Sequence, residues 1–313
     1  MDKNVVIATD KLTKRFGNFT AVNEIYFNVL EGEIFGFLGA NGAGKTTAMR
    51  MLCGLSKPTS GNATIAGFDV YKQTEKIKKN IGYMSQKFSL YEDLTILENV
   101  KFFGGIYGMS RYKIKSKSDE LITLLGLEKE AKKLVGSLPL GWKQKLAFSV
   151  AVFHDPKIVF LDEPTSGVDP ISRRSFWELI NDLSESGTTV FVTTHYLEEA
   201  EFCNNIILIN AGKLIAEGNP KELKTNYLTN DILEVECSNP VKAMELLENA
   251  HYVDQTSIFG NNIHLIMNKG YKEKGQIITL LDELNDIKVN RIDKIVPTLE
   301  DVFIHLLDSK ENV

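Results

Sequence analysis

The chain lacks several features that would assign it to a common class of proteins. It has only three cysteines, Cys53, Cys203 and Cys237, which are widely separated and form no closely spaced pair. Neither a disulfide framework nor a zinc site is therefore indicated, and a reducing cytoplasm fits best. It also lacks a basic balance, because 36 Lys and Arg against 41 Asp and Glu give a net charge of −5. We therefore expect no nucleic-acid partner.

Long apolar runs are also missing. The best stretches, such as residues 206–209, are far shorter than the roughly 18 residues that a membrane-crossing helix needs. The N-terminus has no sustained apolar core of the kind found in a secretory signal. We therefore expect the chain to reach a membrane only through a partner, at the cytoplasmic face.

What is present is an ordinary globular composition with an ordered alternation of patterns. Hydrophobic residues make up 43% and charged residues 25% of the 313 positions, which suits one large domain and a smaller one. Helical patterns alternate with strand-like apolar runs at residues 34–38, 158–161, 189–193 and 206–209. This order predicts an α/β fold with a mainly parallel sheet.

Two segments depart from that alternation. From about Phe88 to Pro156 the spacing of apolar residues is helical, which predicts a helical insertion at about residues 88–156. Within it, the basic run at residues 111–117 favours a solvated helix face over a docking patch. After residue 227 the pattern changes, so we predict a first domain of residues 1–227 and a small α+β domain of residues 228–313.

The expected elements of the second domain follow from its apolar spacing. Strands are predicted at residues 233–237, 263–267 and 287–292. Helices are predicted to open at Asn239-Pro240, to cover residues 277–284, and to begin near Thr298. No motif in this domain indicates a chemical role, so regulation, dimer stabilisation and simple structural support all stay open.

The strongest motif is a phosphate-binding loop (P-loop) with the pattern G-x-x-x-x-G-K-[ST], placed directly between a strand-like and a helical run. Its glycines let backbone N–H groups turn toward phosphate oxygens, and the following helix N-terminus adds partial positive charge. We expect Lys45 to hold the β- and γ-phosphates, Thr46 to supply a hydroxyl ligand for Mg²⁺, and Thr47 to assist at the α-phosphate. The matching residues are Gly39, Ala40, Asn41, Gly42, Ala43, Gly44, Lys45 and Thr46.

Acidic and histidine side chains follow two later strand-like runs. Asp162 and Glu163 come directly after residues 158–161, and His195 follows residues 189–193. Because ligands of parallel sheets gather at the carboxyl ends of strands, we expect all three near the P-loop. Asp162 is predicted to reach the Mg²⁺ shell, Glu163 to orient or deprotonate the attacking water, and His195 to contact the γ-phosphate. Solvated carboxylates and a structural histidine are the alternatives without the P-loop.

Taken in chain order, these motifs resemble the ATP-binding subunits of ABC transporters across residues 5–220, which implies a P-loop NTPase fold. The resemblance implies that Phe16 stacks on adenine and that Gln86 links Mg²⁺ and the attacking water to the helical insertion. It also implies that residues 166–169 cross a dimer interface and that His195 is the switch histidine. Without it, Phe16 would be interpreted as a packed aromatic and Gln86 as a surface amide.

One segment departs from the family pattern. Where the family has Leu-Ser-Gly-Gly-Gln before a helix, this chain has Leu138-Pro139-Leu140-Gly141-Trp142. Pro139 has neither a hydroxyl nor an N–H group for phosphate, but Gly141 and the positive end of the helix remain to bind ATP across a dimer. The alternative is a signature that serves poorly beside a better one on a paralogous subunit, so homodimer and heterodimer both stay open.

Further sequence features resemble the exporter group that works with separate ABC-2-type membrane subunits. They include Glu33-Ile34-Phe35-Gly36-Phe37-Leu38-Gly39 and the C-terminal Pro297-Thr298-Leu299-Glu300-Asp301-Val302-Phe303. The resemblance implies an ATPase that uses ATP and Mg²⁺ to power export of drugs, lipids or other amphiphiles. The alternative is a soluble ABC ATPase acting on ribosomes, DNA or cluster assembly, which the single ATPase unit and the acidic balance disfavour.

Overall fold

The computed structural model describes residues 4–86, 90–271, 274–282 and 287–311. It divides into two compact units, Met1–Glu217 and Gly218–Val313. The division comes before helix α7 (Pro220–Tyr227), whereas the predicted boundary at 227/228 comes after it. The physical reason is that α7 packs against helix α10 (Leu299–Glu311) of the second unit, a long-range contact that no local pattern contains.

The first unit is built on a six-stranded sheet in the order β10-β9-β3-β8-β7-β6. Strand β3 pairs in parallel with β8 and β9, and β7 pairs in parallel with β6 and β8. Every residue of β3, β7 and β8 is buried, which is why these strands contain apolar runs in the sequence. The predicted, mainly parallel α/β core is confirmed. Its strands are β3 (Ile34–Leu38), β6 (Ile81–Met84), β7 (Ile158–Asp162), β8 (Thr189–Thr194), β9 (Asn205–Asn210) and β10 (Lys213–Gly218).

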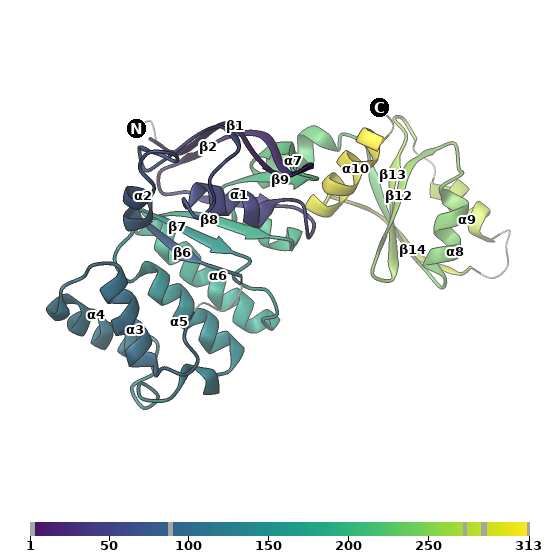
Figure 1. Cartoon of the computed structure of the whole chain (residues 1–313). Helices are drawn as coiled ribbons and strands as arrows, with labels where there is room; N and C mark the ends of the chain where they lie inside the picture. The colour runs from purple at the N-terminus through teal and green to yellow at the C-terminus, as the bar shows by residue number, and fades with distance from the viewer. Residues whose placement is uncertain (1–3, 87–89, 272–273, 283–286, 312–313) are drawn as a thin grey trace. The chain divides into compact units, whose positions relative to one another are not determined.

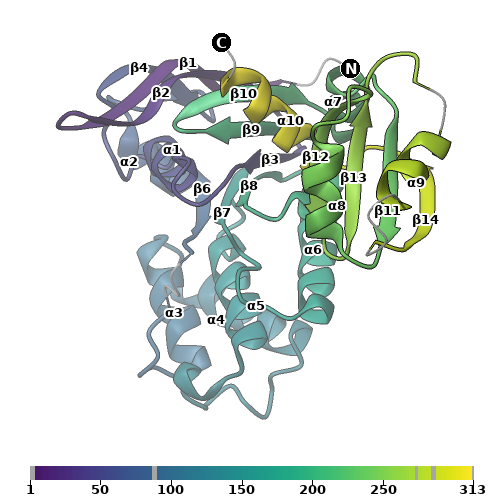
Figure 2. The same cartoon turned by 90° about the vertical axis from the view of Figure 1, so that its right-hand side faces the viewer.

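A second, four-stranded sheet in the order β2-β1-β4-β5 was not predicted from the sequence. Figures 1 and 2 show its strands on the far side of helix α1 (Lys45–Leu52) from the parallel sheet. Phe27 of β2 bridges the two sheets, since its ring lies 5.5 Å from that of Phe35 and 6.0 Å from that of Phe191. The strands are β1 (Val5–Phe16), β2 (Phe19–Leu30), β4 (Ser60–Ile65) and β5 (Phe68–Asp69).

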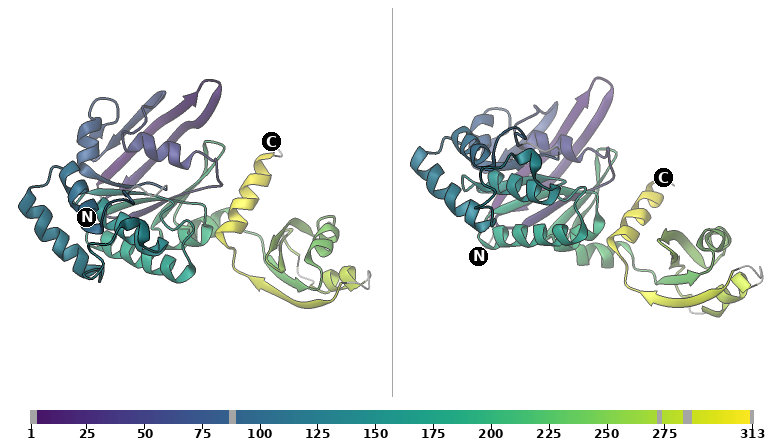
Figure 3. Two further views of the ribbon diagram at one scale, coloured as in Figure 1. Left: turned by 60° about the horizontal axis from the view of Figure 1, so that its bottom comes forward. Right: turned by 90° about the horizontal axis from the view of Figure 1, so that it is seen from below.

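Helices form the rest of the first unit, and Figures 1 and 3 show α3 and α4 gathered at one end of it. The predicted insertion contains three α-helices among its described residues, although its predicted start at Phe88 lies outside them. Helix α6 begins at Pro170, directly after Asp169, whose carboxylate accepts hydrogen bonds from the N–H groups of Ile171 and Ser172. The bounds are α2 (Thr74–Asn80), α3 (Ile96–Ile106), α4 (Arg111–Leu124), α5 (Leu140–Val152) and α6 (Pro170–Glu185), with a 3₁₀ helix, η1 (Val135–Ser137), before α5 and another, η2 (Leu197–Phe202), after β8.

The second unit is an antiparallel sheet in the order β12-β13-β11-β14 with helices packed on it, as the predicted α+β class requires. Apolar residues of β11 and β13 pack with α8 and α9. Because side chains alternate along a strand, His264 of β13 faces the other way, toward Asp301 of α10. Strand β12 was not predicted, and Leu284, the predicted end of α9, lies outside the described residues. The remaining bounds are β11 (Ile232–Cys237), α8 (Pro240–Leu247), β12 (Val253–Phe259), β13 (Asn262–Met267), α9 (Lys274–Asp282) and β14 (Val289–Ile295).

Across the described parts of both units, no helix is long and apolar enough to span a bilayer.

Candidate active site

The P-loop connects the end of β3 to the start of α1, and two of its positions accept only glycine. Gly44 has a φ of 107°, and a Cβ atom there would lie 2.4 Å from the carbonyl oxygen of Ala21. A Cβ atom at Gly39 would lie 2.2 Å from the carbonyl oxygen of Ile209. Larger residues would push the loop away from the backbones that hold it, so these two glycines determine its path.

The loop borders a pocket of about 390 Å³ at the carboxyl ends of the parallel strands. The predicted residues Asn41, Gly42, Gly44, Lys45, Thr46, Thr47, Gln86 and Glu163 all line it, together with Phe19 and Ala21, which the sequence did not indicate. Residues from β6, β7 and the P-loop therefore meet at one place, although they lie far apart in the chain. This convergence is what the sheet order predicts.

Lys45 is almost fully buried beside this pocket, with 4% of its surface exposed. Its ammonium donates to the carbonyl oxygens of Gly39 at 2.8 Å and Ala40 at 3.1 Å. The same Nζ lies 3.1 Å from Oε1 of Glu163. A buried ammonium with several acceptors around it is held in one position, which suits a group that must meet phosphate oxygens.

Asp162, at the end of β7, lies beside the first residues of α1. Its Oδ1 accepts hydrogen bonds from the hydroxyl groups of Thr46 at 3.1 Å and Thr193 at 2.7 Å. Burial raises the pKa of the Asp162 carboxyl above its usual value, although the two hydroxyl groups oppose that effect. Thr193, whose role the sequence did not indicate, therefore positions the carboxylate from the neighbouring strand β8.

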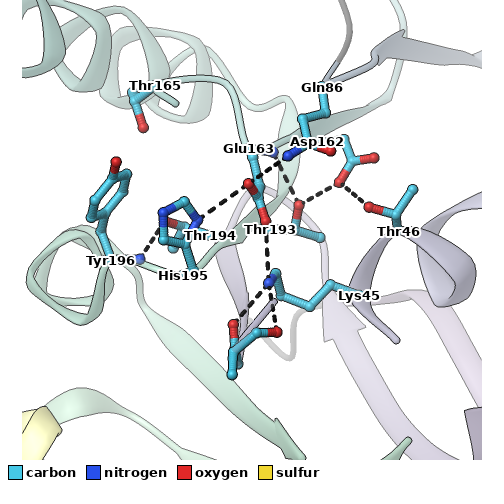
Figure 4. Close-up of polar contacts among 12 residues, drawn as sticks. Lys45, Thr46, Gln86, Asp162, Glu163, Thr165, Thr193, Thr194, His195 and Tyr196 are labelled. Carbon is cyan, nitrogen blue, oxygen red and sulfur yellow. Dashed lines mark hydrogen bonds and ion pairs between the residues drawn. The ribbon is translucent and has the colours of Figure 1, made fainter. Parts of the chain in front are cut away.

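Glu163 is the centre of the site, and Figure 4 shows three side chains that converge on it. Its Oε2 accepts a hydrogen bond from Nε2 of Gln86 at 2.8 Å and lies 3.2 Å from Nδ1 of His195. Its Oε1 faces Lys45. Glu163 also has a positive φ of 48°, a conformation that costs free energy in a non-glycine residue and that its surroundings must hold. The N–H group donates to the hydroxyl of Thr193 at 3.1 Å.

The donor atoms near Thr46 fit Mg²⁺, which prefers oxygen ligands and keeps several waters. Thr46 and Asp162 bring a hydroxyl and a carboxylate oxygen together at the pocket's edge. Among the described residues there is no group of three or more His, Cys, Asp or Glu side chains that could hold a metal ion. The arrangement matches an ion shared with substrate phosphates.

Comparisons with known proteins agree with this geometry. The family model described as "ABC transporter" matches residues 22–166, and the model "ATP-binding protein DrrA1-3-like, C-terminal domain" matches residues 218–307. The bacitracin transport ATP-binding protein BcrA of Bacillus licheniformis is 36% identical over 97% of this chain and 98% of its own length. This chain belongs to the family of ABC transporter ATP-binding proteins.

Some other members of this ABC family match only part of the chain. The probable multidrug ABC transporter ATP-binding protein YbhF of Escherichia coli (strain K12) is 49% identical over 226 residues, which make up 72% of this chain and 39% of YbhF. The chain therefore matches well under half the length of that relative. The solved dimer of the ATP-binding cassette MJ0796, in a post-hydrolysis state bound to ADP and Pi, has a TM-score of 0.62 and 29% identity, and covers 68% of this chain and 98% of that one.

Two aromatic residues of the ABC ATPase unit lie near the pocket, on either side of a tight turn. Phe16 ends β1 and Phe19 begins β2, and the two are paired across the hairpin. Phe16, the residue predicted to stack on adenine, is 55% exposed, and Nζ of Lys14 lies 5.1 Å from its ring centroid. Phe19 lines the pocket and Phe16 does not. The adenine-stacking role of Phe16 stays a prediction, with Phe19 as the residue to compare.

The altered ABC signature forms the start of α5. Pro139 is the residue before the helix, and its carbonyl oxygen accepts from the N–H groups of Trp142 and Lys143, both at 3.1 Å. Gly141 lies in the first turn and faces α6, since a Cβ atom there would lie 3.2 Å from the Ser172 hydroxyl. Gly141 is not among the residues that line the P-loop pocket of its own chain. The contact of Gly141 with ATP stays a prediction.

Proposed function

We propose that this chain is the ATP-hydrolysing subunit of an exporter, acting at the cytoplasmic face of a membrane through separate ABC-2-type membrane subunits. The observation that carries the proposal is the convergence of Lys45, Gln86 and His195 on Glu163 beside the P-loop pocket. The DrrA1-3-like match over residues 218–307 and the export-related names of the relatives support the transport role.

The geometry assigns each side chain a part in hydrolysis. Phosphate oxygens compete with Glu163 for the Lys45 ammonium, so substrate binding leaves one carboxylate oxygen of Glu163 free to accept a proton from water. Gln86 and His195 hold the other oxygen, and thereby keep the carboxylate aimed at the pocket. His195 lies next to the carboxylate and so close to where the γ-phosphate would lie. The Thr46 hydroxyl and Asp162 would hold Mg²⁺, and Gln86, which lines the same pocket as Thr46, would join them through a water molecule.

When bound, Mg²⁺ supplies positive charge that stabilises the phosphate oxygens during transfer of the γ-phosphoryl group to water.

A dimer completes the proposal. Gly141 and the N-terminus of α5 would meet ATP held by a second ATPase subunit, where the helix N-terminus offers partial positive charge without the missing serine. ATP would favour this closed dimer over the products, and closure would act on the membrane subunits. The solved structure of the MJ0796 cassette is a dimer, which supports the proposed dimer of ATPase subunits.

ATP-dependent association of the Glu163→Gln protein tests the dimer, because hydrolysis would otherwise remove the nucleotide that closes it. We expect a homodimer with ATP and a monomer with ADP in light scattering, and the Lys45→Ala/Glu163→Gln double variant serves as a control that should stay monomeric. A monomer under every nucleotide condition would contradict the homodimer and favour a paralogous partner subunit.

Recovery of the tagged chain from solubilised membranes tests the transport role. We expect a multi-span membrane protein to copurify in stoichiometric amount. Recovery with ribosomes instead would support the soluble alternative, in which the same ATPase moves a different load.

A further inference from the structure

A closed chain of contacts connects the loop after β7 to the segment after β8. At its centre is Glu199 of η2, whose carboxylate is only 2% exposed although it lines no part of the P-loop pocket. Burying a carboxylate is costly unless other groups compensate it. Its position between the two segments that carry Glu163 and His195 calls for an explanation beyond packing.

The first contact joins Glu199 to the loop that follows Glu163. The hydroxyl of Thr165, which is 1% exposed, donates to Oε1 of Glu199 at 2.5 Å. Thr165 is tied to Glu163 by a tight turn, in which the N–H group of Ser166 donates to the carbonyl oxygen of Glu163 at 3.2 Å. A shift of Glu199 would therefore reach the backbone of Glu163 through one hydrogen bond and one turn.

The second contact runs through Arg173 of α6. Its Nε lies 3.5 Å from Oε1 of Glu199, and its Nη2 donates to the carbonyl oxygen of Val168 at 3.4 Å. The guanidinium carbon lies 4.3 Å from the ring centroid of Tyr196, a cation–π contact. Arg173 thus fastens the end of the β7–α6 loop and the residue after His195 at the same time.

The third contact returns from Glu199 to His195. The N–H group of Glu199 donates to the carbonyl oxygen of Tyr196 at 3.1 Å, which forms a second tight turn. The N–H group of Tyr196 is held by the hydroxyl of Thr194 at 3.0 Å, as Figure 4 shows. Both arms of the network therefore end next to residues whose side chains meet at 3.2 Å, Glu163 and His195.

We propose that Glu199 is a positioning residue that acts through Thr165 and Arg173. It holds the Glu163 carboxylate and the His195 side chain in the relative positions that ATP hydrolysis requires. It touches neither substrate nor reacting atoms, and it acts by fixing two loops that come from different strands. The positive φ of Glu163 makes this support necessary, because a strained backbone relaxes when its surroundings loosen. The inference rests on the proposed roles of Glu163 and His195.

Steady-state ATP hydrolysis by two matched pairs of full-length variants tests the network. Glu199→Gln keeps the shape and removes the charge, and the same change at the exposed neighbour Glu198 is its control. Thr165→Val removes the hydroxyl, while Thr165→Ser retains it. We expect Glu199→Gln and Thr165→Val to lower kcat by about 10-fold with KM changed by less than about 2-fold, since small misplacements act on the transition state. Glu198→Gln and Thr165→Ser should keep the normal kcat.

The double variant separates positioning from structural support. If Thr165 and Glu199 act as one unit, Thr165→Val/Glu199→Gln should lower kcat no further than Glu199→Gln alone. Normal kcat in folded Glu199→Gln and Thr165→Val proteins, with only a lower Tm, would overturn the proposal, as would full additivity of the two effects. Retention of full activity by Glu163→Gln would instead overturn the proposed function, so the two failures are distinguishable.

Discussion

The first unit buries Lys45, Asp162 and Glu163 beside a pocket, whereas the second unit buries His264 and Asp301 between its sheet and helix α10. Both clusters come from residues far apart in the sequence. In the first, the Lys45 ammonium and the Glu163 carboxylate line a pocket of about 390 Å³ that a substrate can enter. Their charges are therefore available for exchange with a ligand, and that availability marks a functional site.

In the second cluster the charged groups satisfy one another. Nδ1 of His264 lies 2.8 Å from Oδ1 of Asp301, and its Nε2 lies 3.6 Å from Oε2 of Glu234. The ring of Phe259 stacks on the imidazole, and the N–H and hydroxyl groups of Thr298 both donate to Asp301 at 2.7 Å. This cluster fastens the start of α10 to β13. The comparison teaches that burial and charge alone do not identify a site, while burial beside an open pocket does.

The largest effect is expected at Glu163. Glu163→Gln should lower kcat for ATP by at least about 100-fold, because the amide cannot take a proton from water, while Lys45 and Gln86 can still contact its side chain. Thermal unfolding should change less than kcat, because the Lys45 ammonium keeps the carbonyl oxygens of Gly39 and Ala40 as acceptors. The measurement is phosphate release alongside calorimetry, with Glu178→Gln on the exposed surface of α6 as a control. A large drop in Tm with normal kcat would show that the Glu163 cluster serves stability rather than hydrolysis, contrary to the comparison above.

The converse outcome is expected at Asp301. Asp301→Asn should destabilise the second unit by about 3 kcal/mol, because it removes the nearer carboxylate partner of the buried His264 and leaves only Glu234, yet ATP affinity should be unchanged. Both tryptophans, Trp142 and Trp177, lie in the first unit, so their fluorescence reports the unfolding of that unit alone. Circular dichroism reports the unfolding of both units, and a transition seen only by circular dichroism belongs to the second unit. Asp282→Asn, at an exposed position, is the control. Loss of ATP binding by Asp301→Asn would contradict the claim that this cluster stabilises the second unit without affecting the ATP site.

The pH dependence of the second unit follows from the same pair. Burial lowers the pKa of His264, but hydrogen bonds and charges of Asp301 and Glu234 outweigh it and raise the net value, whereas His264 and Thr298 lower the pKa of Asp301 against the effect of burial. The contribution of His264 to the stability of the second unit is full below about pH 6.5. It is lost as the pH rises through the raised pKa of His264 in the folded state. The contribution of Asp301 to the same stability is present above about pH 3.9. It is lost as the pH falls through the lowered pKa of Asp301 in the folded state.

We therefore expect urea unfolding followed by circular dichroism to show a lower free energy of unfolding for the second unit at about pH 9 than at about pH 6. His264→Gln should remove this loss and lower the stability at the acidic end. Arg291, which pairs with Glu234 at 2.7 Å, keeps its charge across the range. A wild-type profile as flat as that of His264→Gln would contradict a charged pair.

The smallest effect concerns the edge of the pocket. Phe16→Ala should weaken ATP binding by about 1–3 kcal/mol, the range for one aromatic ring stacked on a base, and Phe19→Ala should weaken it less. Titration with ATP and with inorganic triphosphate separates loss of stacking from loss of phosphate contacts. A larger, adenine-dependent effect at Phe19 would transfer the stacking role to the residue that lines the pocket.

Sequence patterns predicted the parallel core well because buried strands are apolar runs that need no long-range knowledge, as in residues 158–161 and 189–193. They missed β6 and β10, the two edge strands of that sheet, and also β1, β2 and β12, whose mixed polarity reflects strands with one exposed side. The domain boundary was placed after α7 because its contact with α10 is visible only in the folded chain. Motif order predicted the residues around Glu163, but nothing local distinguished Thr193, Phe19 or Glu199 from ordinary neighbours.

The sequence by itself determined the chemistry that the first unit offers: the glycines, Lys45 and Thr46 of the P-loop, and the carboxylates and histidine that end two apolar strands. Local spacing suffices there, because a parallel sheet brings the carboxyl ends of its strands to one edge whatever lies between them. Only the tertiary structure decided how Glu163 is held, since its partners Gln86 and His195 and the supporting Glu199 belong to separate segments. Hydrogen bonds between distant segments leave no periodic trace in a sequence, and their geometry exists only after the chain has folded.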